Sequence, residues 1–92
     1  MKTYFLILRA RPVPGNPNFG VVPGVSAYFW VRERRPDGAM RRARHYLKHQ
    51  GWGLERIELD AMLSGPALHS WSENESAAYR KAQEFGISMF LK

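Results

Sequence analysis

The chain has 92 residues, of which 45% are hydrophobic and 24% are charged, and its formal net charge is +6. These values are ordinary for a globular protein and exclude a disordered or fibrous chain, and the length predicts one domain spanning residues 1–92. Because the chain contains no cysteine, disulfides, thiolate metal sites and cysteine nucleophiles are excluded.

The first predicted strand runs from Thr3 to Ala10, a stretch rich in aromatic and branched residues. This apolar run is too short for a signal peptide, and no run in the chain approaches membrane-spanning length. We therefore expect a soluble, cytoplasmic protein with no membrane partner. Residues 12–23 follow with four of the six prolines, which predicts a stiff loop whose amides cannot join a strand ladder.

Residues 25–34 predict a second strand, because their odd positions are all apolar and their even positions are amphipathic or charged. Successive side chains of a strand point to opposite faces of the sheet. The pattern therefore directs the odd positions to the core. The even positions are expected to point outward, and they include Tyr28, Trp30, Arg32 and Arg34.

A basic amphipathic helix is predicted over residues 39–50, with Asp37 as its N-cap and Gly51 as the residue that ends it. On a helical wheel the apolar side chains form one stripe, and every cation falls on the opposite side. An ordinary helix that packs on a core would place its solvated residues in the same way. The cations also form a candidate nucleic-acid contact, through Arg41, Arg42, Arg44 and Lys48.

Residues 52–63 alternate again and predict a third strand, whose odd positions Ile57, Leu59, Ala61 and Leu63 are assigned to the face that the helices cover. A strand, a helix and a strand in succession predict a right-handed crossover, with the third strand parallel to the second. After a loop opened by Gly65 and Pro66, Ser72 and Glu75 form a predicted capping box for a second helix over residues 73–85. Gly86 ends this helix, and residues 87–91 predict a short last strand.

These elements predict an α+β fold in the order ββαβαβ: a two-layer sandwich in which two helices pack on one face of a mixed sheet of about four strands. The other face of the sheet is then open. It would present an aromatic and charged surface made of Tyr28, Trp30, Arg32, Arg34, Glu58 and Asp60. Soluble monomers rarely leave such a patch open without using it for contact.

The distribution of charge fits two kinds of partner. Residues 1–51 carry ten Lys/Arg against two acids, a net +8, whereas residues 52–92 carry four against six, a net −2. The halves are thus complementary to each other, and the first half is also complementary to an anion. We favour a non-enzymatic module that self-associates as a dimer through the open face, because Glu58 and Asp60 on that face would repel phosphate. The alternative is a nucleic-acid-binding domain that uses the basic half and the aromatic face.

Catalytic and metal sites have little support in the sequence. Glu58 and Asp60 would lie about 7 Å apart on one strand face, but pairing with arginine explains them more simply than catalysis does. His45 and His49 share a helix face, with His69 as a distant third ligand, yet neighbouring arginines would repel a dication. We expect no catalytic residue, no metal and no cofactor.

Overall fold

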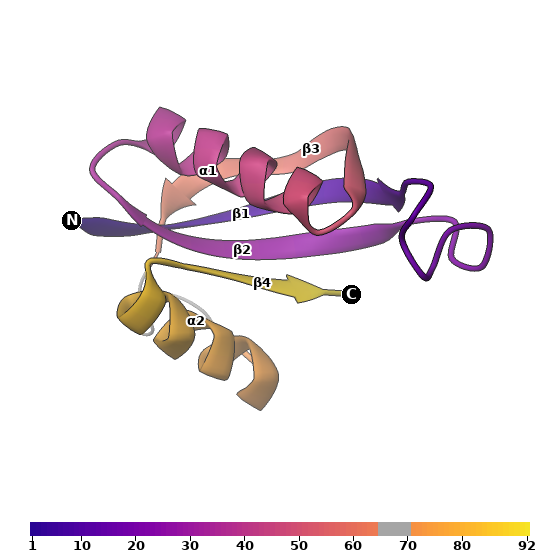
Figure 1. The fold of residues 1–92 in the computed structure, drawn as a ribbon. Helices are drawn as coiled ribbons and strands as arrows, with labels where there is room; N and C mark the ends of the chain where they lie inside the picture. The colour runs from indigo at the N-terminus through magenta and orange to yellow at the C-terminus, as the bar shows by residue number, and fades with distance from the viewer. Residues whose placement is uncertain (65–70) are drawn as a thin grey trace.

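The computed structural model describes residues 1–64 and 71–92 and confirms the predicted order of elements (Figure 1). They are β1 (Lys2–Pro12), β2 (Val25–Glu33), α1 (Pro36–His49), β3 (Trp52–Leu63), α2 (Glu73–Phe85) and β4 (Ile87–Leu91). The fold is therefore α+β, as predicted. In the part of the chain that the structure describes, neither helix has the length and apolar character needed to cross a membrane.

The sheet is antiparallel throughout, with strand order β3-β1-β2-β4. The predicted mixed sheet is therefore wrong. β2 and β3 do run in the same direction, since both are antiparallel to β1, but β1 lies between them. β1, the hairpin partner of β2, fills one edge of β2 and β4 fills the other, and β3 pairs on the far side of β1.

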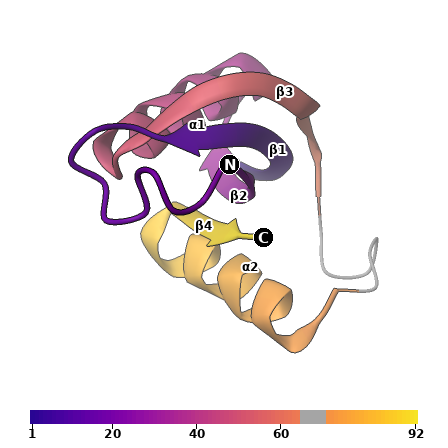
Figure 2. The same cartoon turned by 90° about the vertical axis from the view of Figure 1, so that its right-hand side faces the viewer.

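The two helices lie on opposite faces of the sheet, so the prediction of two layers with both helices on one face is also wrong (Figure 2). α1 covers the face formed by the odd positions of β2. The core on this side contains Tyr4, Leu6, Leu8, Ala10, Ala27, Phe29, Val31, Ala39, Ala43, Leu47 and Trp52. α2 covers the other face, where Phe5, Trp30 and Ala82 form a second buried cluster. Both faces are apolar enough to need a covering helix.

The helix ends follow the sequence signals with one exception. Ser72 and Glu75 form the predicted capping box of α2, and Gly86 ends this helix with φ +88°. Gly51 adopts φ +85° after α1, as predicted. The predicted N-cap Asp37 is wrong, because Arg35 occupies that position and Asp37 lies in the first helical turn. There its carboxylate faces the positive end of the helix dipole.

The loop between β1 and β2 is fastened to the turn that joins α1 to β3. Asn16 is buried in this loop, and its Nδ2 donates a hydrogen bond of 2.9 Å to the carbonyl oxygen of Gly51. The backbone nitrogen of Val13 donates to the same oxygen at 3.1 Å. These two bonds fix the start of β3 beside the end of β1.

Candidate interaction surfaces

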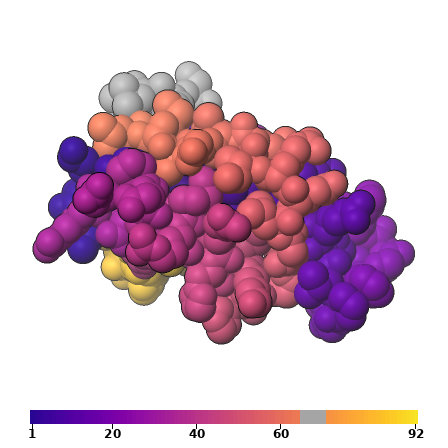
Figure 3. Space-filling view, turned by 90° about the horizontal axis from the view of Figure 1, so that it is seen from above, coloured from indigo at the N-terminus to yellow at the C-terminus, as the bar shows by residue number. Residues whose placement is uncertain are grey.

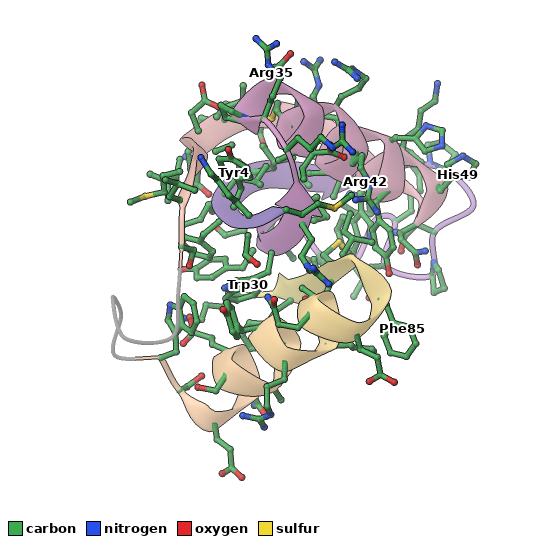
Figure 4. All side chains as sticks on the ribbon, turned by 90° about the vertical axis from the view of Figure 1, so that its left-hand side faces the viewer. Tyr4, Trp30, Arg35, Arg42, His49 and Phe85 are labelled. Atoms are coloured by element: carbon green, nitrogen blue, oxygen red, sulfur yellow. The ribbon has the colours of Figure 1, made fainter. Side chains whose placement is uncertain are left out.

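The predicted aromatic surface is not open, because Trp30 is 0% exposed. Its ring lies between the sheet and α2 (Figure 4). The ring centroid of Trp30 is 5.0 Å from that of Phe5 and 5.5 Å from that of Trp71. The predicted exposure of Trp30 is therefore wrong. The sequence predicted that Trp30 points outward, because the face formed by the even positions of β2 was expected to have no covering helix. α2 covers that face, and the large apolar ring of Trp30 packs beneath it.

The other three predicted residues of β2 differ in how they are used. Tyr28 is half-buried, with its ring 5.7 Å from that of Phe5 and the Nζ of Lys92 lying 4.7 Å from its centroid. Arg32 is also half-buried, and its Nη1 donates a 2.9 Å hydrogen bond to the carbonyl oxygen of Gln83 in α2. Arg34 is exposed. Thus the even positions of β2 mainly hold α2 in place.

Glu58 and Asp60 do not pair with the arginines of β2, which corrects a further prediction. Arg32 lies opposite Thr3 at the start of β1, whereas Glu58 lies near Ser26 at the other end of β2. Glu58 instead accepts a 2.7 Å hydrogen bond from the hydroxyl of Ser26 and lies 3.7 Å from Nη2 of Arg56. Asp60 accepts a 2.7 Å hydrogen bond from the backbone nitrogen of Ala61. Both acids remain exposed on β3.

β3 carries the surface that the sequence did not reveal. It is a 12-residue strand at the edge of the sheet, and its atoms lie at the molecular surface (Figure 3). Four of its large apolar side chains are exposed: Leu54 at 36%, Ile57 at 45%, Met62 at 42% and Leu63 at 52%. Period-two alternation had assigned Ile57 and Leu63 to the covered face. The charged side chains of Glu55, Arg56, Glu58 and Asp60 were the signal of an edge position.

The pairing of β3 with β1 is interrupted, which explains why simple alternation failed. The register shifts between Met62 and Leu59, between Leu59 and Ile57, and between Arg56 and Leu54. Such shifts move following side chains to the other face and increase the twist of an edge strand. Arg56 and Ile57 lie in the regular segment between two of these shifts, opposite Arg9 and Leu8.

The cations of α1 form a second candidate surface. Arg41, Arg44 and Lys48 are exposed along the helix, together with His45 and His49. Two open hollows flank this ridge. One, of about 480 Å³, lies beside Ile87 of β4, and the other, of about 590 Å³, lies beside Trp52 and Leu54.

Arg42 is the exception among the predicted nucleic-acid contacts. Its Nη1 donates a 2.9 Å hydrogen bond to the carbonyl oxygen of Arg32 and lies 3.7 Å from Oε2 of Glu33. It therefore ties α1 to the end of β2 and is only partly available. By contrast, Arg44 and Lys48 form no ion pair with any residue that the structure describes.

The paired histidines of α1 do not make a metal site on their own. The ring centroids of His45 and His49 are 4.4 Å apart. Within residues 1–64 and 71–92 no group of three or more His, Asp or Glu side chains is placed to hold a metal ion. His69, the third ligand considered from the sequence, lies outside the described residues.

Comparisons with protein-family models, with curated proteins and with solved structures found no match to this chain.

Proposed function

We propose that this chain is a non-enzymatic interaction module that self-associates as a dimer through the outer edge of β3. The observation that carries the proposal is the exposure of Leu54, Ile57, Met62 and Leu63 on one long edge strand. An edge strand also offers unpaired backbone groups to a second strand. The proposed contact surface therefore lies along the β3 edge of the sheet, and not on the aromatic face, where Trp30 is buried.

A second copy of the chain is the partner that β3 fits best. Arg56 and Glu58 stand on the same edge strand with opposite charges, so this edge is complementary to itself. Two strands that pair with themselves form an isologous contact that closes after two copies. The five-residue β4 at the other edge is a much poorer template than β3. The absence of cysteine suits a reducing compartment, and cytoplasmic localisation remains part of the proposal.

Light scattering after size-exclusion chromatography tests the dimer. We expect a mass twice that of the 10.6 kDa chain, and a single-chain mass for Ile57→Lys because a buried unpaired charge opposes the contact. The matched control is Phe85→Lys on α2, which also replaces an exposed apolar side chain, one that is 64% exposed. This control should remain dimeric. A wild-type chain that stays single at high concentration would remove the proposal.

Nucleic-acid binding through α1 is the second candidate function. It is supported by the exposed row of Arg41, Arg44, His45 and Lys48, whose spacing places them on one side of the helix. In the described residues the nearest competing acid, Asp37, pairs only with Arg35 and Arg41, at 3.5 and 3.7 Å. Arg44 and Lys48 are therefore available to phosphates.

Fluorescence anisotropy with labelled single-stranded and duplex oligonucleotides at two salt concentrations tests this candidate. Phosphate contacts release counterions, so we expect affinity that falls steeply as salt rises, and a large loss of affinity in Arg44→Glu/Lys48→Glu. The control Arg80→Glu/Lys81→Glu makes the same change of charge on α2 and should bind more tightly than the α1 variant. Equal losses in the two variants would show that net charge alone is responsible.

A further inference from the structure

We infer that two copies pair β3 with β3 in antiparallel register, with Ile57 on the two-fold axis and Arg56 of each copy facing Glu58 of the other. This inference rests on the proposed self-association and adds the geometry of the contact. It follows from the symmetry of the pairing, from the charges along β3, and from the position of the register shifts.

Symmetry limits the registers that need to be compared. In an isologous antiparallel strand pair the two-fold axis is perpendicular to the sheet and keeps each residue on the same face in both copies. One residue must therefore lie on the axis, and all other pairs occur twice. β3 spans Trp52–Leu63, so its middle falls between Ile57 and Glu58. Two registers therefore keep nearly the whole strand paired, with the axis at Ile57 or at Glu58.

Charge separates these two registers. With the axis at Glu58, this carboxylate would face its own copy. Like charges directly opposite each other destabilise a strand pair. With the axis at Ile57, the two apolar side chains meet, Arg56 faces Glu58 twice, and no like charges are opposite.

The faces of the sheet agree with this register. Ile57 is opposite Leu8 of the core under α1, so it points to the α1 side. Arg56 is opposite Arg9 and therefore points to the α2 side. Glu58 bonds to Ser26, an even position of β2, and is on that same side. Each Arg56 can thus meet the Glu58 of a partner on one face of a continuous sheet.

The local balance of charge also favours a second carboxylate at this point. Arg9 and Arg56 are direct neighbours across β1 and β3, and Glu58 is the one acid that contacts Arg56 in the described residues, at 3.7 Å. Two guanidinium groups, those of Arg9 and Arg56, thus lie beside one carboxylate, and the Glu58 of a second copy would supply a second negative charge. Because register shifts lie on both sides of residues 56 and 57, we expect a short central ladder flanked by apolar contacts.

Complementary charge reversal tests the register. Arg56→Glu leaves acids at both positions and Glu58→Arg leaves bases at both, so each variant alone should run as a single chain in light scattering. Their equimolar mixture should form a heterodimer. The double variant Arg56→Glu/Glu58→Arg should form its own dimer again. Circular dichroism checks that each variant is folded.

The controls separate a failure of the register from a failure of the dimer. Arg80→Glu and Glu84→Arg reverse an arginine and a glutamate on exposed positions of α2, and both should stay dimeric. A wild-type chain that never dimerises would overturn the proposed function and this inference together. A wild-type dimer whose two β3 variants do not combine would overturn the register alone.

Cross-linking gives an independent measurement, because the natural chain has no cysteine. Residues facing each other across antiparallel strands have Cα atoms about 4.5–5.5 Å apart, a distance that a disulfide spans. Ile57→Cys should therefore give a covalent dimer on mild oxidation. Met62→Cys should not, since five residues on each side of the axis separate its two copies by about 33 Å. The reverse result would overturn the register.

Discussion

Trp30 is buried on all sides, and yet its Nε1 has no hydrogen-bond partner among residues 1–64 and 71–92. An unsatisfied buried donor usually costs free energy. The contacts of the indole ring with Phe5 and Trp71 evidently outweigh that cost. The role of Trp30 is therefore to fill the space between the sheet and α2.

Replacing Trp30 distinguishes this role from surface recognition. Trp30→Ala should lower the free energy of unfolding by about 3–5 kcal/mol, because it leaves a cavity under α2. A surface substitution without special contacts changes it by about 0.5 kcal/mol or less. Urea unfolding followed by circular dichroism gives the value, with Trp30→Phe as the milder variant. A cost near zero for both would contradict the burial of this side chain.

Glu75 carries an ionisable carboxyl group in the first turn of α2. Burial of its carboxyl group opposes the charge, but hydrogen bonds from the backbone and hydroxyl of Ser72, together with Lys92, outweigh this effect and lower the pKa of Glu75 below its usual value of 4.5. The Nζ of Lys92 lies 3.7 Å from Oε1 of Glu75. The folded state therefore favours the carboxylate more than the unfolded state does.

The sign of the pH effect follows from this lowered pKa. The contribution of Glu75 to stability is complete above pH 4.5 and is lost as the pH falls through the lower pKa of the folded state. We expect Glu75→Gln to be less stable than the wild type at pH 7 and the difference to shrink towards pH 3. Thermal unfolding at several pH values measures this. A difference that stays constant with pH would contradict the role of the charge.

At the scale of elements, α2 illustrates what periodicity can and cannot predict. Its bounds followed from Ser72, Glu75 and Gly86, because capping residues act locally. The face that it covers depends on contacts distant in sequence. Gln83 donates a 2.8 Å hydrogen bond to the hydroxyl of Thr3, and Arg32 bonds to the carbonyl of Gln83. No pattern within residues 73–85 contains that information.

The same limit explains the error over β3. Alternation correctly predicted a strand over residues 52–63, but register shifts place Ile57 and Leu59 on different faces. Which neighbour a strand chooses was not predictable either, because β1 has two usable edges and β2 occupies only one. The candidate site therefore moved from β2 to β3, two places away in the sheet, while Glu58 and Asp60, exposed on β3, were among the predicted interaction residues.

At the scale of the whole molecule, the two proposed functions use different parts of the surface. A β3 dimer with a continuous sheet would place both α1 helices on the same side, since a two-fold axis between antiparallel edge strands is perpendicular to the sheet. The exposed cations of α1 would then form one broad basic surface. Self-association would thus strengthen binding to a long polyanion through two linked contacts without any new residue.

The central position of β1 also has a consequence during synthesis. Of the four strands, β1 leaves the ribosome before the others and is one of the two inner strands of the sheet, so its far side remains bare until residues 52–63 have emerged to pair with it. A nascent chain that has reached only the end of α1 therefore exposes an apolar β edge to other chains. Pairing between segments this distant in sequence also slows folding, so a chaperone that shields β1 would act in the interval before β3 arrives.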